Sequence, residues 1–401
     1  MGKSEAASSD TARYRTRNGW LGLTLPAKEG RCEIGFDGGY SSTIGCSAAG
    51  MSMIPSLAVE QGRRGASFRQ PGEDDIEYRE KSPDGTMHVW SVGEMAYREH
   101  AKQSATSASR HGMRWFASPM FRVLFRTTAG LALVGGPKCD GPRPSTGSRV
   151  MVETGLPPED YEDETLRQDL RRAIAGRHTF ELRVGGGAWM PFDFAIADDD
   201  VVVGRQAIAA LMAVSVLQDG RPAPGCQRFF RSRVQVIDLG SVTGDVVTLA
   251  NGEVLKVLTL RGSVMDEVMQ RTCRELETAY PQAGRVSVDA LHEALESGSI
   301  RMTVDRENMV RKLVPVAEPF KKSLKAVFAE TFAKIREESD SWEEVDIIIA
   351  EGGTYEAWHE LFEERFKDAG IEIVPGNVNV PNMPLTHVNA YGYRAHLMRK
   401  Q

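Results

Sequence analysis

Cysteine is scarce in this chain: five cysteines occur among 401 residues, widely spaced and without a CxxC pair. An odd number of isolated cysteines argues against a disulfide framework, and zinc sites usually need closely spaced pairs. Reduced thiols are typical of the cytoplasm, so a cytoplasmic location is expected. Long apolar runs are also missing, since no stretch approaches the roughly 20 residues that cross a bilayer. The polar N-terminus lacks the apolar core of a secretory signal, so no membrane partner is expected.

An excess of one charge is missing as well. The formal net charge is −6, with acidic and basic residues interspersed. This argues against a general nucleic-acid or membrane-surface binder. What is present is an ordinary globular composition, with 41% apolar and 26% charged residues. A length of 401 residues predicts two domains rather than one small core.

Strand-like and helix-like segments alternate along the chain, which predicts an α/β fold with mixed sheets. The polar segment 1–30 predicts a flexible tail, and the Pro-, Gly- and Arg-rich segment 221–233 predicts a crossing between domains. The other expected elements are strand–turn–strand units over 31–50 and 234–260, helices over 118–135, 164–176, 204–220 and about 306–337, two helices near 264–296, a strand–helix–strand unit over 345–375, and a helix in the C-terminal tail.

The two strand–turn–strand units share one pattern. Each places an aspartate at the end of a strand, then a glycine, then a turn that carries hydroxyl side chains. They lie roughly 200 residues apart, about half the chain, so they form an internal repeat. The first reads Asp37-Gly38-Gly39-Tyr40-Ser41-Ser42-Thr43, and the second reads Asp238-Leu239-Gly240-Ser241-Val242-Thr243-Gly244-Asp245.

Both turns have the composition of an anion-binding loop. A tight glycine turn lets backbone N–H groups converge on an anion, and hydroxyl side chains add donors without charge. An aspartate at the end of the preceding strand can hold Mg²⁺ directly or through water, because Mg²⁺ takes few carboxylates together with phosphate oxygens. A single copy is usually only a turn. Two copies, one from each domain, would close on a polyphosphate from opposite sides of a cleft.

A third segment points to the same ligand. The buried strand ending in "IIIA" runs into Glu351-Gly352-Gly353-Thr354 and then into a helix. A strand, two glycines and a helix N-terminus give a nucleoside or its phosphate access to the backbone. This segment is a weak signal alone, but the three segments in this order indicate a nucleotide site.

These segments resemble a known superfamily. "IGFDGGYSST", "VIDLGSVTGDVV" and "IIIAEGGT" look like the phosphate 1, phosphate 2 and adenosine segments of the actin-like ATPases. Within that superfamily the chain most resembles bacterial and archaeal actin-like proteins of the ParM plasmid-segregation type, through "MIPSLAVE", "VWSVGEMA", "VETGLPPEDY" and "HVNAYGYRAHL". The resemblance covers residues 31–397.

The resemblance implies a duplicated, ribonuclease H-like fold of two domains with a nucleotide cleft between them. The implied domains span 31–205 and 206–380, and the helix within 381–401 would pack back on the first domain. The implied cofactors are ATP, with GTP as an alternative, and Mg²⁺.

The resemblance also implies roles for single residues. Asp37 and Asp238 would flank Mg²⁺ and its water shell. The two turns would hold the β- and γ-phosphates, and the glycines of the third segment would lie against the adenosine. The implied nucleotide contacts are Gly38, Gly39, Tyr40, Ser41, Ser42 and Thr43 from the first domain, Gly240, Ser241, Val242 and Thr243 from the second, and Gly352, Gly353 and Thr354.

The implied catalytic residues are Asp238 and Gln206. Gln206 takes the place of the family's water-positioning residue, at the start of the helix before the second hairpin. A neutral glutamine can orient a water but is a poor base, so slow hydrolysis is expected. Alternatively, Gln206 is only a polar helix-start residue. Arg274 and Glu275 stand where the family often places base and ribose contacts, or on a solvated helix face.

Three positions depart from the family pattern. Ile44 stands where the first turn often ends in Lys or Arg, the pair Ser241 and Val242 where glycines are common, and Glu351 where a small residue is usual. Glu351 is expected to narrow the nucleotide pocket or to change base preference. Both aspartates are retained, so nucleotide binding is expected.

Other polar clusters have simpler explanations. His359, Glu360 and Glu363 lack a second histidine at zinc spacing and fit an exposed helix face, and His178 has no visible Cys or Ser partner. Three arginines fit a solvated loop or a contact with a partner or polymer: Arg228, Arg231 and Arg233.

The expected function is an ATPase that polymerises head to tail, because a heterologous, non-closing interface yields an open helical filament. By family resemblance, the filament would move plasmid DNA through a separate adaptor protein, without direct nucleic-acid contact. The alternatives are a small-molecule kinase of the same superfamily and a nucleotide-binding scaffold with negligible hydrolysis. A DnaK-type chaperone is disfavoured because no β-rich substrate domain follows.

Overall fold

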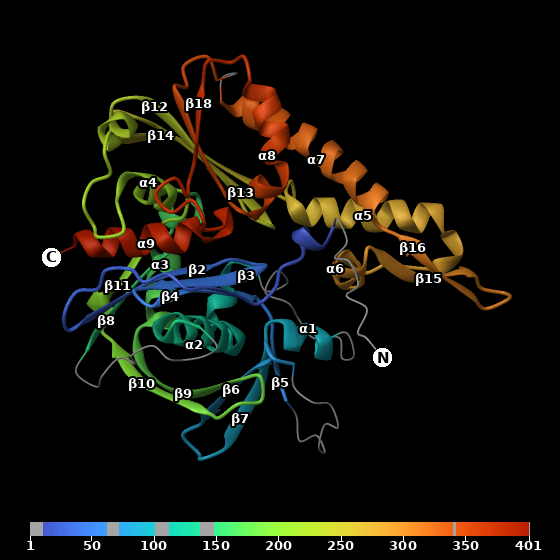
Figure 1. The fold of residues 1–401 in the computed structure, drawn as a ribbon, viewed down its shortest axis with the longest axis horizontal. Coiled ribbons are helices and arrows are strands. Elements are labelled where there is room, and N and C mark those ends of the chain that lie inside the picture. The colour runs from blue at the N-terminus through green and yellow to red at the C-terminus, as the bar shows by residue number, and fades with distance from the viewer. Residues whose placement is uncertain (1–10, 62–71, 101–111, 137–147, 340–341, 401) are drawn as a thin grey trace.

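The computed structural model describes residues 11–61, 72–100, 112–136, 148–339 and 342–400. Two halves lie one above the other in Figure 1, with the C-terminal helix α9 (Val388–Arg399) between them. The lower half holds the strands up to β11 (Val201–Arg205), and the upper half holds β12 (Arg233–Leu239) to β18 (Glu372–Pro375). Among the described residues, no helix is long and apolar enough to cross a membrane.

The lower half contains two sheets with a helix between them. The larger sheet has the strand order β1-β4-β3-β2-β8-β11, and the other has β10-β9-β6-β7-β5. The bounds are β1 (Gly19–Leu21), β2 (Arg31–Gly38), β3 (Ser42–Ser47), β4 (Gly50–Pro55), β5 (Ala58–Glu60), β6 (Ile76–Lys81), β7 (Met87–Val92), β8 (Arg149–Leu156), β9 (Gly176–Val184) and β10 (Met190–Ile196).

Helix α2 (Pro119–Val134) fills the space between these sheets, and nearly all of its residues are buried. Its ends follow from local chemistry. Ser118 caps the N-terminus by accepting a hydrogen bond from the N–H of Phe121, and Pro119 occupies the first turn, where no N–H is needed. Gly135 ends the helix at a φ of 78°, which glycine adopts without a side-chain clash. Helices α1 (Glu94–His100) and α3 (Glu164–Ile174) complete this half.

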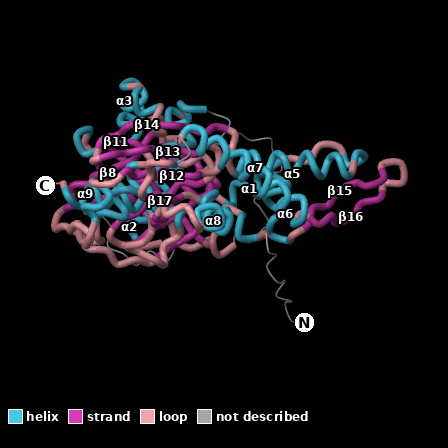
Figure 2. Tube along the Cα trace, turned by 90° about the horizontal axis from the view of Figure 1, so that it is seen from above, coloured by secondary structure: helices cyan, strands magenta, loops and turns pink. Residues whose placement is uncertain are grey.

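The upper half is built on the sheet β14-β13-β12-β17-β18. Its remaining strands are β13 (Thr243–Ala250), β14 (Glu253–Arg261) and β17 (Ile347–Glu351), and its helices are α5 (Met265–Ala279), α6 (Val288–Ser297), α7 (Ala317–Glu338) and α8 (Gly353–Phe366). The hairpin of β15 (Ser299–Asp305) and β16 (Val310–Pro315) projects from the body of the molecule in both views (Figures 1 and 2).

The main sheets of the two halves repeat one strand pattern. In the lower half β3 and β2 are antiparallel, and β2, β8 and β11 are parallel. In the upper half β13 and β12 are antiparallel, and β12, β17 and β18 are parallel. The predicted α/β class with mixed sheets is confirmed, and the sequence repeat corresponds to a repeat of strand pairing.

Helix α9 contacts both halves at very short range. A Cβ atom placed on Gly35 of β2 would lie 1.8 Å from the carbonyl oxygen of Ala390, and one on Gly392 would lie 2.0 Å from that of Ala209 in α4 (Ile208–Ser215). Real side chains cannot occupy such positions, so only glycine permits this approach. The buried apolar cluster of the upper half continues through α4 and α9 to Ile44 in the lower half.

Two predicted elements differ from the structure. The long helix predicted over about 306–337 begins only at Ala317, and β16 occupies Val310–Pro315. Val310–Pro315 pairs antiparallel with β15, and Pro315, which has no N–H to donate, suits the end of an edge strand better than a helix interior. The helix predicted over 204–220 is shorter, because Gly204 and Arg205 complete β11 and the helix ends at Ser215.

The predicted flexible tail over 1–30 does not describe residues 11–30. Ala12 is buried in a 3₁₀ turn over Ala12–Tyr14, and β1 pairs with β4 in the main sheet. The sequence did not predict an ordered structure here because the segment is polar. Its contacts are mostly made by arginine, threonine and tyrosine, and it has no apolar periodic face. Residues 1–10 lie outside the described part of the chain.

Candidate functional site

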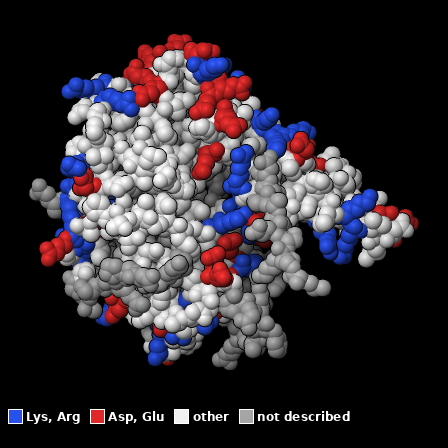
Figure 3. Space-filling model, in the orientation of Figure 1, with Lys and Arg blue, Asp and Glu red and all other residues white. Residues whose placement is uncertain are grey.

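A cavity of about 880 Å³ opens between the two halves. The three segments selected from the sequence all line it, although they lie far apart in the chain. The lining includes Asp37, Gly38, Gly39, Tyr40, Ser41, Ser42, Gln206, Asp238, Gly240, Ser241, Val242, Thr243, Glu351, Gly352, Gly353 and Thr354. Figure 3 shows Lys and Arg side chains beside the hollow between the two halves. Acidic side chains gather at the top of the same view, on the upper half.

The first hairpin turns tightly between β2 and β3. Asp37 pairs with Ile44 and Gly38 with Thr43 across the two strands. The carbonyl of Gly39 accepts a hydrogen bond of 2.6 Å from the hydroxyl of Ser56, which fixes the turn from behind. A Cβ atom on Gly39 would lie 2.8 Å from the carbonyl oxygen of Ser42, so the turn needs glycine there.

Thr43 is the predicted phosphate contact that the structure does not bring to the cavity. It is buried, and its hydroxyl is 2.7 Å from the hydroxyl of Thr128 in α2. Successive side chains of a strand point to opposite faces, so the side chain after Ser42 turns away from the cavity. The expected hydroxyl contact to phosphate is therefore wrong for Thr43.

The second hairpin is built in the same way from β12 and β13. Asp238 pairs with Asp245 across the strands, and the N–H of Gly240 donates to the carbonyl of Thr243 at 3.0 Å. The carbonyl of Ser241 accepts from the N–H of Asp266 at 2.7 Å, which ties the turn to the start of α5. The departure from glycine at Ser241 is therefore accommodated without opening the turn.

The third segment lies directly beside the second hairpin. Strand β17 runs parallel to β12, with Glu351 paired to Asp238. Gly352 adopts a φ of 93°, and a Cβ atom there would lie 2.3 Å from the carbonyl oxygen of Leu239. The hydroxyl of Thr354 donates to the carbonyl of Gly240, so it binds the hairpin.

Four carboxyl groups gather at this place: Asp238, Asp245 and Glu351 are buried, and Asp37 is half-buried. Burial, and then the nearby Asp238, raise the pKa of Asp37 to about 8. Burial raises the pKa of Asp238 to about 6, although a hydrogen bond from Asn389 opposes this. Burial and the three aspartates raise the pKa of Glu351 well above its usual range. Without a counter-charge these groups cannot all ionise, so the site favours a bound cation.

The residues fit a magnesium–polyphosphate complex rather than an all-protein metal cage. Within the described residues, no three His, Cys, Asp or Glu side chains gather closely enough to hold a metal ion. Mg²⁺ usually keeps waters and phosphate oxygens and needs only one or two carboxylates. Asp37 and Asp238 supply that pair at a cavity bordered by glycine turns.

Gln206 lies at the lower end of the cavity, between β11 and α4. Its side-chain amide is 3.5 Å from Oδ1 of Asp37, and its backbone N–H donates to Leu156 at 2.9 Å. Gln206 therefore stands two residues before α4, and its side chain faces the first aspartate. This arrangement leaves the glutamine able to orient a water beside Asp37.

Several other candidates lie elsewhere. Arg274 pairs with Glu267, and Glu275 pairs with Lys322; neither Arg274 nor Glu275 lines the described cavity. His178 is buried against Arg126 in the lower half. His359 pairs with Glu363 along α8 at 3.2 Å, but His359 and Glu360 also line the cavity.

The arginines of the 221–233 segment have mixed surroundings. Arg228 pairs with Glu372 of β18, Arg233 pairs with Glu344, and Arg231 is exposed. These pairs bind the segment to the upper sheet.

Sequence reasoning missed two groups at the site. Asn389 of α9 donates to Asp238 at 2.8 Å. Four residues of the N-terminal segment also line the cavity: Arg13, Tyr14, Arg15 and Thr16. Neither group stands in a recognisable local motif, so only the tertiary fold could reveal them.

No protein-family model matches the chain, and no curated protein is similar to it in sequence. Solved structures do match. A non-polymerisable quadruple mutant of pCBH ParM superposes with a TM-score of 0.67 at 15% identity, covering 92% of this chain and 100% of that one. The chain has the actin-like fold. The resemblance inferred from the sequence is therefore confirmed at the level of the fold.

Two further solved structures share this fold. The 15-stranded ParM filament from Clostridium botulinum matches with a TM-score of 0.64 at 15% identity, over 92% of this chain and 99% of that one. The archaeal actin homologue Ta0583 in complex with ADP matches with a TM-score of 0.61 at 17% identity, over 92% and 100%. One of these proteins forms a filament and the other binds ADP.

Proposed function

We propose that this actin-like chain binds Mg-ATP in the cleft, hydrolyses it slowly and assembles head to tail into filaments. One observation carries the proposal: two aspartate–glycine hairpins and a Gly-Gly helix start, far apart in sequence, line the same cavity. The ADP complex of Ta0583 and the Clostridium botulinum filament support it, since both share this fold.

Asp37 and Asp238 would hold Mg²⁺, which when bound neutralises phosphate charge. The backbone of the two glycine turns would cradle the β- and γ-phosphates through Gly38 to Ser42 and Gly240 to Thr243. Gly352 and Gly353 would leave room for the adenosine. Gln206 would orient a water beside Asp37, and its weak basicity fits slow hydrolysis.

The two-sided site suggests how nucleotide could control assembly. A triphosphate held by hairpins from both halves would favour a closed arrangement, and loss of the γ-phosphate would remove part of that link. A closed subunit that associates head to tail gives an open polymer, because the interface does not close on itself.

The finer parts of the proposal extend the family resemblance seen in the sequence. They are ATP as the nucleotide, with GTP as the alternative, a domain boundary at 205/206 with α9 assigned to the first domain, and plasmid DNA as cargo through an adaptor in the cytoplasm. Filaments that co-sediment with naked DNA would contradict the adaptor.

Light scattering with ATP, ADP or no nucleotide, together with phosphate release, tests the proposal. Assembly with ATP, followed by delayed phosphate release, is the expected result. Soluble turnover that needs an added hydroxyl compound would instead indicate a small-molecule kinase. Pelleting to the same extent with ATP, with ADP and without nucleotide would indicate a scaffold with negligible hydrolysis.

Site variants sharpen this test. Asp238→Ala is expected to abolish Mg-ATP binding and ATP-dependent assembly, whereas Asp84→Ala, in the exposed turn after β6, should behave like wild type. Gln206→Ala should assemble but release phosphate more slowly, leaving persistent polymers. If Gln206→Ala releases phosphate at the wild-type rate, Gln206 has no role in hydrolysis.

A further inference from the structure

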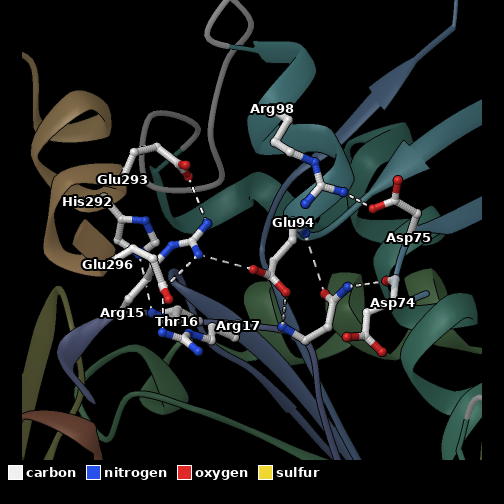
Figure 4. Close-up of polar contacts among 11 residues, drawn as sticks. Arg15, Thr16, Arg17, Asp74, Asp75, Glu94, Arg98, His292, Glu293 and Glu296 are labelled. Carbon is white, nitrogen blue, oxygen red and sulfur yellow. Dashed lines mark hydrogen bonds and ion pairs between the residues drawn. The ribbon is translucent and has the colours of Figure 1, made fainter. Parts of the chain in front are cut away.

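The N-terminal segment of residues 11–21 passes between the two halves of the molecule (Figures 1 and 4). Toward the upper half, the hydroxyl of Thr11 donates to the carbonyl of Leu295 at 2.8 Å, and the ring of Tyr14 lies 4.9 Å from that of Phe320. Toward the lower half, Gly19–Leu21 pairs with β4 as the edge strand β1. The segment is therefore attached to both halves.

Arg15 joins carboxylates from both halves through a single guanidinium group. It lies 3.4 Å from Glu94 of α1 in the lower half, and 2.9 Å and 3.2 Å from Glu293 and Glu296 of α6 in the upper half. Figure 4 shows Arg15 between these acidic side chains. The side chains of Arg15 and Glu94 are 10% and 15% exposed, so water screens this pair weakly. The side chains of Glu293 and Glu296, by contrast, are 44% and 42% exposed.

Neighbouring contacts reinforce the same crossing. Asn18 exchanges hydrogen bonds with Glu94, and its side-chain amide donates to the carbonyl of Asp74 at 2.8 Å. The N–H of Thr16 donates to Nε2 of His292 in α6 at 3.3 Å. The His292 ring also stacks on Tyr97 of α1, with ring centres 5.3 Å apart. The segment thus fills the space where α1 and α6 meet.

The same segment forms part of the cavity wall. Arg13, Tyr14, Arg15 and Thr16 all line the cavity that holds the two hairpins. Helix α9, the other element that contacts both halves closely, lies away from α1 and α6 in Figure 1. The cleft is therefore bridged at two separate places.

We propose that residues 11–21 form an intramolecular clamp that holds the two walls of the cleft together, with Arg15 at its centre. The clamp limits how far α6 moves away from α1. It also slows release of the bound nucleotide, and this second effect rests on the proposed function.

Three single variants of the full chain test the clamp. Arg15→Ala removes the bridge, and Glu94→Gln removes its partner on the lower half. Arg177→Ala is the matched control, because Arg177 lies outside the clamp, forms an exposed ion pair with Asp193 within the lower half and does not line the cavity. Circular dichroism confirms that each variant is folded.

The first measurement needs no nucleotide. Small-angle X-ray scattering is expected to give a larger radius of gyration for Arg15→Ala and Glu94→Gln than for wild type and Arg177→Ala. Hydrogen exchange is expected to rise in α6 for the same two variants. The second measurement follows release of a fluorescent ATP analogue, which should be about tenfold faster in these variants, within the usual range of coupling between sites.

The outcomes separate the two proposals. Unchanged scattering and exchange for both Arg15→Ala and Glu94→Gln would overturn the clamp, as would an equal change in Arg177→Ala. If the wild-type protein binds no analogue, the proposed function fails, while scattering and exchange still decide the clamp. If the variants have a larger radius of gyration but release the ATP analogue no faster than wild type, the clamp has no role in nucleotide exchange.

Discussion

Asn389 of α9 donates a hydrogen bond of 2.8 Å to Oδ2 of Asp238, at the end of β12. The C-terminal helix therefore supports the second hairpin from below the site. An amide donor stabilises the ionised form of an aspartate, and here it opposes the effect of burial on the pKa of Asp238.

Replacing Asn389 with alanine is expected to weaken Mg-nucleotide binding by about tenfold, because a hydrogen bond to a charged group contributes about 1.5–3 kcal/mol. Isothermal titration with Mg-ATP measures this change. Asn377→Ala is the control, since the Asn377 amide donates to the carbonyl of Met383 instead. Equal affinities in wild type and Asn389→Ala would contradict the role of Asn389.

Gly352→Ala is expected to destabilise the fold by about 3 kcal/mol or more, because its backbone conformation is nearly restricted to glycine and the new Cβ would collide with the carbonyl of Leu239. Gly370→Ala is the comparison at an open left-handed position, since Gly370 has a φ of 70° and open space around it. Urea unfolding measures both. Similar losses in the two variants would show that the collision is relieved at little cost.

Glu351→Gln is expected to raise the melting temperature of the nucleotide-free protein. Glu351 is 1% exposed, its Oε1 has no hydrogen-bond partner, and three aspartates lie nearby. The amide that replaces this carboxyl cannot ionise, so the variant avoids the cost of burying a charge or of taking up a proton beside the three aspartates, on the order of 1–3 kcal/mol. Glu153→Gln is the contrasting variant: Glu153 is also buried but lies 2.7 Å from His396, so its loss should lower the melting temperature. A lower melting temperature for Glu351→Gln would show that the carboxyl has a stabilising partner.

His178 is expected to make stability fall in acid. Nε of Arg126 donates to Nδ1 of His178 at 3.1 Å, and Nε2 of the ring lies 2.8 Å from the carbonyl of Ile174, so the folded state holds the neutral ring. Burial, and then Arg126, lower the pKa of His178 to about 4 from 6.5. Above pH 6.5 neither state binds the proton, whereas between pH 6.5 and about 4 only the unfolded state binds it.

Stability should therefore fall as the pH drops through this window, by about 3 kcal/mol in total for this one group. Urea unfolding between pH 7 and pH 4 measures the loss, and His178→Gln should lose less over the same range. Parallel pH profiles for wild type and His178→Gln would contradict this assignment.

The sequence predicted the parts of the site that are encoded locally. Asp37 and Asp238 each end a strand before a glycine turn, and this chemistry is visible within a few residues. The strand before Gly352 was equally clear, because it is apolar and continuous. The internal repeat of the two aspartate–glycine hairpins predicted that they would meet at one cavity.

The parts that were missed depend on contacts between distant segments. Thr43 has the right residue type, but the strand alternation that directs it to Thr128 depends on where β3 begins. Arg15 is one polar residue in a polar segment, and its meaning comes from Glu94 and Glu293, which lie far along the chain. The strand at Val310–Pro315 was missed because the helical pattern that follows it was extended too far back.

The glycine contacts of α9 have a mechanical consequence. At Gly35 and Gly392 the backbones already touch, so α9 cannot move closer to β2 or to α4 without a steric collision. The two glycines therefore set how close the lower half and α4 lie to the C-terminal helix. A larger side chain at either position would push α9 outward, and this would also displace Asn389, which donates to Asp238.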